Sequence, residues 1–249
     1  MQLQTKLLTV MALAVLGLSA CKQQTSGNDA AALPAASTEA AAVAAAATPQ
    51  AGPAKYRVEF TPLWTKDNFP FEYPDTSLIH KPHFSGLIGT AHNAGFHLFM
   101  DGQTPSPGIE RLSEMGKHDP LDAEINSAIA SGNALALTES EPLKDFSQTA
   151  TAEVAVDDAH PMVSLVAMIA PSPDWFAAAS DVNLMENGAW VASKTVDAEA
   201  WDSGGDDGTT YLADDKDTDP KKPTGLNKGQ HFMKDGKTMP VGRITFTRI

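Results

Sequence analysis

Carboxylate side chains are concentrated between residues 197 and 219, and two of them, Asp202 and Asp206, are four residues apart across Gly204 and Gly205. A glycine pair lets the backbone turn tightly and direct its carbonyl groups inward. Carboxylate and carbonyl oxygens are the ligands of hard cations, and calcium takes about 6–8 of them. From the residues alone, a solvated acidic loop is nevertheless the simpler interpretation, and a metal site is the alternative.

A further aspartate, Asp174, belongs to a separate segment. It follows Pro171 and Pro173, which predict a stiff, non-helical backbone. Aspartates held close together repel one another unless a cation lies between them. The pattern is not that of an EF-hand, because Gly204 occupies a position that requires Asp or Asn and no 12-residue loop closes with Glu.

The sequence supports neither of two serine-hydrolase motifs. DSGG at residues 202–205 is similar to the nucleophile motif of trypsin-like proteases, and Ala91-His92 is similar to their histidine motif. Trp201 and Asp206, however, stand where that motif needs Gly and Pro, and a single cysteine excludes the usual disulfides. No G-x-S-x-G nucleophile motif is present. We therefore expect no catalytic residues and no enzyme activity.

Two pairs of histidines, His80 with His83 and His92 with His97, raise the alternative of a zinc site. Lys81-Pro82 prevents His80 and His83 from sharing a helix face, and His92 and His97 have no third ligand spaced nearby. Buried hydrogen bonds that hold loops together are the expected role of His83, His92 and His160.

Short strands dominate the sequence from residue 55 to the end. Apolar and polar residues alternate over 56–60, 152–156 and 243–247, which is typical of half-buried strands. Residues 162–170 (MVSLVAMIA) are apolar on both faces, which predicts a central strand. Gly, Pro, Asn and Asp turns separate these segments, and the fold class is mainly β.

One helical interval interrupts the strands. Asp119 is a suitable N-cap, Pro120 suits the first helical position, and Gly132 suits the end. Between them Leu121, Ile125 and Ile129 recur every four residues. A shorter helical turn is expected over 109–115, and both are expected in a crossover on the protein surface.

Three segments resemble the spondin domain family of F-spondin and mindin. They are HFSGLIGTAHN (83–93), HPMVS leading into MIAPSPDWF (160–176), and WDSGGDDG (201–208). The family patterns are HFSPLIGATHN, HP-VS with IAPSPDW, and WDAGTDSG. Their order and spacing agree, and the resemblance extends from about Tyr56 to the C-terminus.

The resemblance implies a C2-like antiparallel β-sandwich in the jelly-roll style, with one or two short helices in a crossover. It also implies one calcium ion bound in loops at one end. The matching motif positions of the family's calcium carboxylates are Asp174, Asp202 and Asp206. This chain departs from the pattern at Ser203, Gly205 and Asp207, and Asp207 is either an additional ligand or a solvated neighbour.

The N-terminus carries a bacterial lipoprotein signal. Lys6 precedes an apolar run over 7–18, and Leu18-Ser19-Ala20 leads into Cys21, the single cysteine. We expect cleavage before Cys21 and acylation of that residue, which anchors the chain in a membrane. Residues 1–20 are thus a signal peptide, 21–54 a lipidated cysteine with a disordered Ala-rich tether, and 55–249 the spondin-like domain.

The net charge of the chain limits the kinds of molecule that it can bind. The net charge of −13 makes nucleic acid a poor partner, and a cation a good one. We expect a non-enzymatic, calcium-binding module of the bacterial cell envelope, in the outer membrane, that binds an unidentified protein or glycan in adhesion or ligand capture. The alternatives are an envelope hydrolase with a calcium-poised acidic site and a calcium-dependent, C2-like lipid or glycan binder.

Overall fold

The structure is a computed structural model, and it describes residues 51–75, 77, 81–143 and 148–249. Cys21 and the expected tether as far as residue 50 lie outside the described residues. Among the described residues, no helix is long and apolar enough to cross a membrane.

An antiparallel β-sheet forms the centre of the fold. Its main path has the order β4-β3-β6-β7-β10-β14-β1-β5, with β2 paired to β6 and β11 paired to β10. The ten strands are β1 (Ala54–Pro62), β2 (His83–Phe84), β3 (Ile88–His92), β4 (Ala134–Glu139), β5 (Ala150–Val156), β6 (Met162–Ala170), β7 (Trp175–Asn183), β10 (Ser193–Asp202), β11 (Gly225–Leu226) and β14 (Gly242–Arg248).

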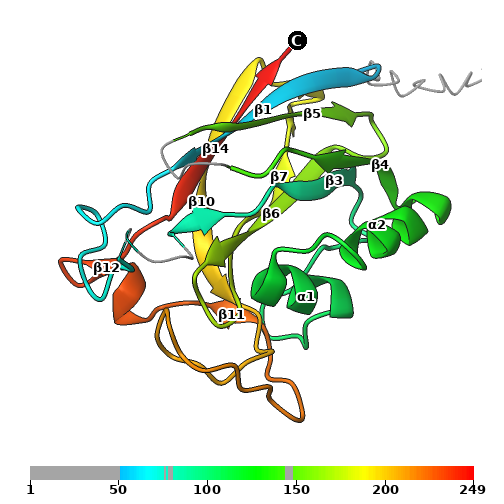
Figure 1. Cartoon of the computed structure of the whole chain (residues 1–249). Coiled ribbons are helices and arrows are strands. Elements are labelled where there is room, and N and C mark those ends of the chain that lie inside the picture. The colour runs from blue at the N-terminus through cyan, green and yellow to red at the C-terminus, as the bar shows by residue number, and fades with distance from the viewer. Residues whose placement is uncertain (1–50, 76, 78–80, 144–147) are drawn as a thin grey trace, which may run out of the picture. The chain divides into compact units, whose positions relative to one another are not determined.

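The sheet curls until its two ends meet. Strands β4 and β5, at opposite ends of the path, lie against each other, and the curved sheet wraps around the core (Figure 1). The expected mainly β, antiparallel architecture is therefore confirmed. The expected C2-like sandwich of two sheets is not confirmed, because the strands form one continuous, nearly barrel-shaped sheet.

Residue alternation places the strands as the sequence predicts. In β1, Tyr56, Val58 and Phe60 are buried, while Arg57 is exposed. Strands β5 and β14 show the same alternation. Strand β6 is buried on both faces from Val163 onward. Residues from other strands of the curved sheet pack against its inner face, and the two helices cover its outer face.

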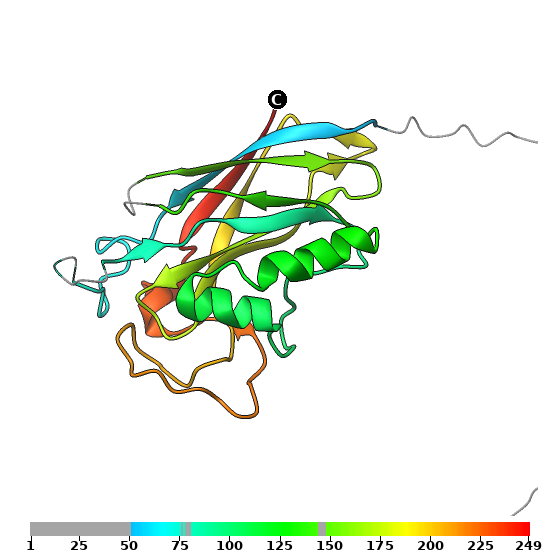
Figure 2. The same ribbon diagram turned by 45° about the vertical axis from the view of Figure 1, so that its right-hand side comes forward.

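Two helices lie in the crossover between β3 and β4, as expected. They are α1 (Pro107–Met115) and α2 (Leu121–Ala130), and they pack side by side on the outer face of the sheet (Figure 2). The core between helices and sheet contains buried Ile109, Leu112, Leu121 and Ile125 against Ile88, Val166 and Phe176.

The helix ends differ in part from the prediction. The N-cap of α2 is Pro120, with no side-chain cap hydrogen bond, so the expected Asp119 cap is wrong. Gly132 ends the interval as predicted, with a positive φ of 75°. In α1 the cap is Ser106, whose Oγ accepts from the backbone N–H of Ile109 at 3.2 Å.

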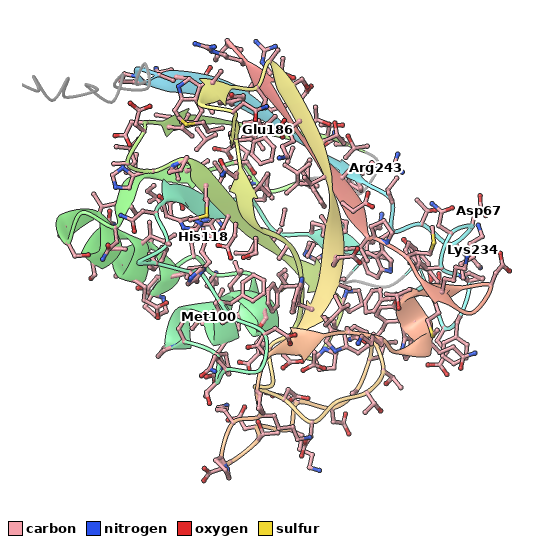
Figure 3. The ribbon with its side chains drawn as sticks, turned by 180° about the vertical axis from the view of Figure 1, so that it is seen from behind. Asp67, Met100, His118, Glu186, Lys234 and Arg243 are labelled. Atoms are coloured by element: carbon pink, nitrogen blue, oxygen red, sulfur yellow. The ribbon has the colours of Figure 1, made fainter. Side chains whose placement is uncertain are left out.

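Smaller elements complete the domain. They are the hairpins β8 (Met185–Glu186) with β9 (Ala189–Trp190) and β12 (Met233–Lys234) with β13 (Lys237–Thr238), and the 3-10 helix η1 (Gln230–Phe232). Lys234 Nζ donates to the backbone carbonyl of Asp67 at 3.4 Å, which joins the second hairpin to the segment after β1 (Figure 3).

Candidate functional site

The register of two neighbouring strands brings Asp174 and Asp202 together. Strands β7 and β10 pair antiparallel, with Asp202, the last residue of β10, opposite Trp175, the first residue of β7. Asp174 immediately precedes β7, so both aspartates lie at the same end of the sheet. The loop of residues 203–224 begins there and returns to β11, where Gly225 pairs with Asp202 (Figure 1).

Asp174 is fully buried, with 0% of its surface exposed. Its Oδ2 accepts three hydrogen bonds from the loop: Ser203 Oγ at 2.8 Å, Gly205 N at 2.8 Å and Asp206 N at 3.2 Å. Its Oδ1 is equally buried and has no hydrogen-bond partner among the described residues. Burial raises the pKa of Asp174, although the hydrogen bonds from the loop act in the opposite direction.

Asp202 is the electrostatic partner of Asp174. Burial, and then the negative charge of Asp174, raise the pKa of Asp202 to about 6. Its Oδ1 accepts from the backbone N–H of Gly204 at 3.0 Å. The buried indole N–H of Trp175 lowers the Asp202 pKa by its proximity, but it forms no hydrogen bond of normal geometry.

Asp206, the third aspartate expected to bind calcium, forms hydrogen bonds within its own loop. Both carboxylate oxygens of Asp206 accept backbone N–H groups, one from Gly208 and one from Lys216. Each oxygen keeps a second lone pair for a further interaction. The side chain is buried, with 5% exposed, and its backbone N–H donates to Asp174, so Asp206 belongs to the same centre.

Asp207 has a different environment. It forms ion pairs with Lys222 and with Lys216, the latter at 3.6 Å. The hydrogen bond from Lys222 lowers the pKa of Asp207. The aspartates farther along the loop are exposed, as the sequence predicts: Asp214, Asp215, Asp217 and Asp219.

The loop frame depends on one glycine and two buried threonines. Gly204 has a φ of 86°, and a Cβ added there would lie 2.2 Å from the carbonyl oxygen of Lys222. Thr218 Oγ1 donates to the carbonyl of Gly204 at 2.7 Å, and Thr224 Oγ1 donates to the carbonyl of Ser203 at 2.9 Å. These bonds hold the loop backbone against the end of β10.

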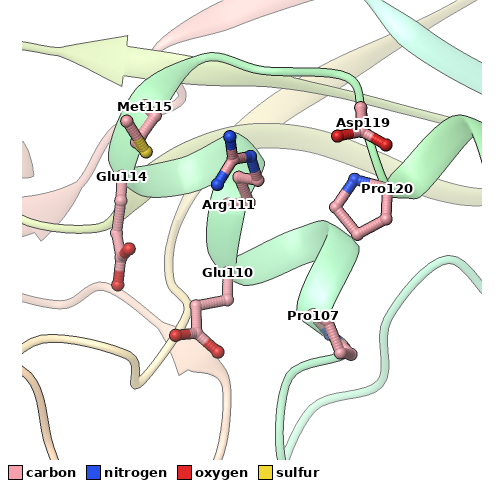
Figure 4. A pocket seen from close by; sticks show the side chains of 7 residues that line it. All are labelled: Pro107, Glu110, Arg111, Glu114, Met115, Asp119 and Pro120. Carbon is pink, nitrogen blue, oxygen red and sulfur yellow. The ribbon is translucent and has the colours of Figure 1, made fainter.

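Helix α1 adds carboxylates that the sequence reasoning missed. Glu110 and Glu114, one helical turn apart, project from the same side of α1, away from Arg111 (Figure 4). They line a surface pocket of about 470 Å³ together with Pro107, Arg111, Met115, Asp119 and Pro120. The available signal was two glutamates spaced by four residues in a helix without a basic residue in its last turn.

The oxygen-rich donor set of this centre suits calcium. Among the residues that the structure describes, no three His, Cys, Asp or Glu side chains form a group of metal-binding geometry. Asp174 and Asp202 nevertheless couple electrostatically, and the buried, unpartnered Asp174 Oδ1 has the acceptor capacity that a hard cation requires.

The residues of the protease-like motifs lie in separate environments. Ser203 donates to Asp174, whereas His92 Nε2 is 2.8 Å from Ser164 Oγ. All four side chains are fully buried, so neither serine is accessible to a substrate. His92 Nδ1 also bonds the carbonyl of Asn93 at 2.9 Å, which gives this histidine the loop-holding role expected from the sequence.

The antiparallel sheet, the crossover helices and the acidic loop define a spondin-type domain, and the comparisons with known proteins agree. The Spondin_N family model matches residues 54–232, so the chain belongs to this family. It is 28% identical over 210 residues to human Spondin-2, covering 79% of this chain and 62% of that protein. It is 30% identical over 214 residues to human Spondin-1, covering 80% of this chain and 26% of that protein.

A relative from another vertebrate class gives the same result. Spondin-1 of Xenopus laevis is 29% identical over 209 residues, which cover 80% of this chain and 25% of that protein. The chain thus matches about three fifths of the length of Spondin-2 and about a quarter of the length of Spondin-1.

Proposed function

We propose that this chain is a non-enzymatic, calcium-binding module of the bacterial cell envelope. Asp174, Asp202 and Asp206 would hold one calcium ion, and the ion would supply the positive charge that the buried carboxylates lack. With the loop fixed by calcium, the domain would present a stable surface to a protein or glycan ligand in adhesion or ligand capture.

A single observation carries this proposal. Asp174 is fully buried, yet its Oδ1 has no hydrogen-bond partner among the described residues. Leaving one oxygen of a buried carboxylate without a hydrogen-bond partner costs roughly 1–3 kcal/mol. A bound cation removes that cost, and calcium is favoured because the neighbouring donors are all oxygens.

The first test compares the stability of the domain with and without calcium. With an affinity of about 0.1–1 mM, typical of extracellular modules, a few millimolar calcium adds about 1–2 kcal/mol to the free energy of unfolding. The melting temperature should rise by several degrees. Magnesium should act less, because it demands a tighter octahedral site.

Matched aspartate variants locate the site. Asp202→Asn should weaken the calcium-induced rise in melting temperature. Asp214→Asn, on the exposed part of the same loop, should leave it intact. Equal responses of the two variants, or a wild-type melting curve that calcium does not move, would show that the assignment is wrong.

The cell-surface part of the proposal rests on Cys21 and the apolar run before it. Lipidation of Cys21 would tether the domain to a membrane, and Lys22 after it is consistent with sorting to an outer membrane. The intact mass of the native protein should include acyl chains, and Cys21→Ser should release the protein from the membrane fraction. A native protein with a free Cys21 thiol in the soluble fraction would overturn this part.

The two alternative functions are distinguished by a binding and activity screen. A C2-like lipid binder would sediment with anionic vesicles only when calcium is present, whereas a glycan or protein binder would not. A hydrolase lacks support, because Ser203, the serine of the protease-like DSGG motif, is fully buried. Sustained hydrolysis by the purified chain would contradict the non-enzymatic assignment.

A further inference from the structure

Glu114 presents a second unpartnered carboxylate oxygen beside the aspartate centre. Its side chain is partly buried, and its Oε1 is a buried atom with no hydrogen-bond partner among the described residues. Glu114 comes from the last turn of α1, whereas Asp174 comes from the turn between β6 and β7. Two separate elements thus bring carboxylate groups, each with one unpartnered oxygen, against the loop of residues 203–224.

Gly205 connects these two carboxylates. Its backbone N–H donates to Asp174 Oδ2 at 2.8 Å. On the other side, a Cβ added at Gly205 would lie 2.8 Å from Glu114 Oε1 and 3.2 Å from Glu110 Cγ. The absence of a side chain at this position therefore lets the acidic side of α1 approach the peptide group that binds Asp174.

Several interactions disfavour a charged Glu114 in the absence of a cation. The last turn of α1 contains no basic residue, and the negative end of a helix dipole repels a carboxylate. Burial, and then the charge of Glu110, raise the pKa of Glu114 to about 7. Lys221 acts in the opposite direction, and Asp217 and Asp174 add smaller upward contributions.

The neighbouring lysine already has other partners. Lys221 Nζ is 2.7 Å from Glu110 Oε1 and 3.3 Å from the carbonyl oxygen of Gly205. Its ammonium group therefore pairs with Glu110 and donates to the loop backbone, and it forms no hydrogen bond with Glu114 Oε1. Among the described residues, no side chain therefore donates a hydrogen bond to Glu114 Oε1, and an additional cation could contact it.

We propose that Glu114 is a fourth carboxylate of the calcium site, contributed by helix α1 in addition to the three aspartates. This inference rests on the proposed calcium-binding function. It couples the ion to the crossover: calcium would join the end of the sheet to the C-terminal turn of α1 through the two unpartnered oxygens. In the calcium-free protein the same carboxylate destabilises that junction.

Calorimetric titration with calcium chloride tests the proposal on the chain from Cys21 onward. Glu114→Gln should bind calcium about tenfold more weakly than wild type, because calcium affinity follows the number of ligand charges. Without calcium, the variant should melt at the same temperature as wild type or higher, since a repelled charge is removed. Asp119→Asn is the matched control: it removes one negative charge from the same pocket, at an exposed position.

The outcomes separate this inference from the proposed function. If wild type binds no calcium, the proposed function fails and this inference fails with it. A second outcome overturns only the inference: wild type binds calcium, Asp202→Asn binds it weakly, and Glu114→Gln binds it as tightly as wild type. Equal weakening by Glu114→Gln and Asp119→Asn also overturns it, because the effect would then be long-range charge alone.

A measurement on wild type decides the case in which Glu114→Gln does not fold. The assigned side-chain carboxyl ¹³C resonance of Glu114 should shift during a calcium titration with the same midpoint as the change in melting temperature. An unmoved Glu114 resonance at saturating calcium would overturn the proposal.

Discussion

Ser203 is joined to Asp174 by two hydrogen bonds. Its backbone N–H donates to the Asp174 carbonyl at 3.1 Å, and its Oγ donates to Asp174 Oδ2 at 2.8 Å. The first bond sets the loop against the start of β7, and the second supplies one of the three donors to the buried carboxylate. The serine thus compensates part of the desolvation of Asp174 even when no cation is bound.

Replacing this serine by alanine should separate loop stability from calcium binding. Ser203→Ala should lower the calcium-free free energy of unfolding by about 1.5–3 kcal/mol, because a hydrogen bond to a charged group is lost. Calcium binding should persist, since the spondin pattern WDAGTDSG carries alanine at this position. Urea unfolding with and without calcium measures both effects.

Ser113→Ala is the control for the serine variant. Ser113 is also fully buried, but its Oγ donates to the neutral carbonyl of Glu110 at 2.8 Å. Its loss should be smaller, about 0.5–1.5 kcal/mol. A larger loss in Ser113→Ala than in Ser203→Ala would contradict the role of Ser203 in compensating the Asp174 charge.

Gly204 should be intolerant of any side chain. Gly204→Ala adds a Cβ at 2.2 Å from the Lys222 carbonyl oxygen, on a residue with a φ of 86°. Strain and overlap together should cost about 3 kcal/mol or more. Gly102→Ala is matched in backbone, with a φ of 78° and no heavy atom within 4 Å of the added Cβ. It should cost only about 1–2 kcal/mol, so equal melting temperatures for the two variants would contradict the close approach.

The sequence predicts the strands well because alternation is a local property. Tyr56, Val58 and Phe60 are buried as predicted, and β6 is buried on both faces. The closure of the sheet is not local: whether β4 meets β5 depends on the accumulated twist and curl of every strand between them. For that reason the sequence supports antiparallel β structure but does not distinguish a two-sheet sandwich from a nearly closed sheet.

The candidate site was predictable to a similar degree. The motifs identify Asp174 and Asp202, and the β7–β10 register brings these residues together. Glu114 lies outside the matched motifs and approaches the loop only through the packing of α1 against Gly205. The orientation of Asp206 toward Gly208 and Lys216 also depends on the loop conformation, which residue spacing does not determine.

The acidic centre should give the calcium-free domain an unusual dependence on pH. The pKa of Glu114 is raised from 4.5 to about 7, and that of Asp202 from 3.8 to about 6. Between about pH 4 and 7 the folded state therefore binds more protons than the unfolded state at these two positions. Their contribution to stability is fully present below the unfolded pKa values and is lost as the pH rises through the folded values.

Calcium should reverse this dependence, because a cation favours the ionised carboxylates. In calcium-depleted buffers, the double variant Glu114→Gln, Asp202→Asn should lose less stability than wild type between pH 4 and 7. The calcium-induced rise in melting temperature of wild type should grow over the same range, as protons cease to compete. Asp207→Asn is the control: Lys222 lowers the pKa of Asp207 below 3.8, so its contribution disappears only in more acidic solution. If wild type and the double variant lose stability equally between pH 4 and 7, while Asp207→Asn alters that interval, Glu114 and Asp202 are not the groups that titrate.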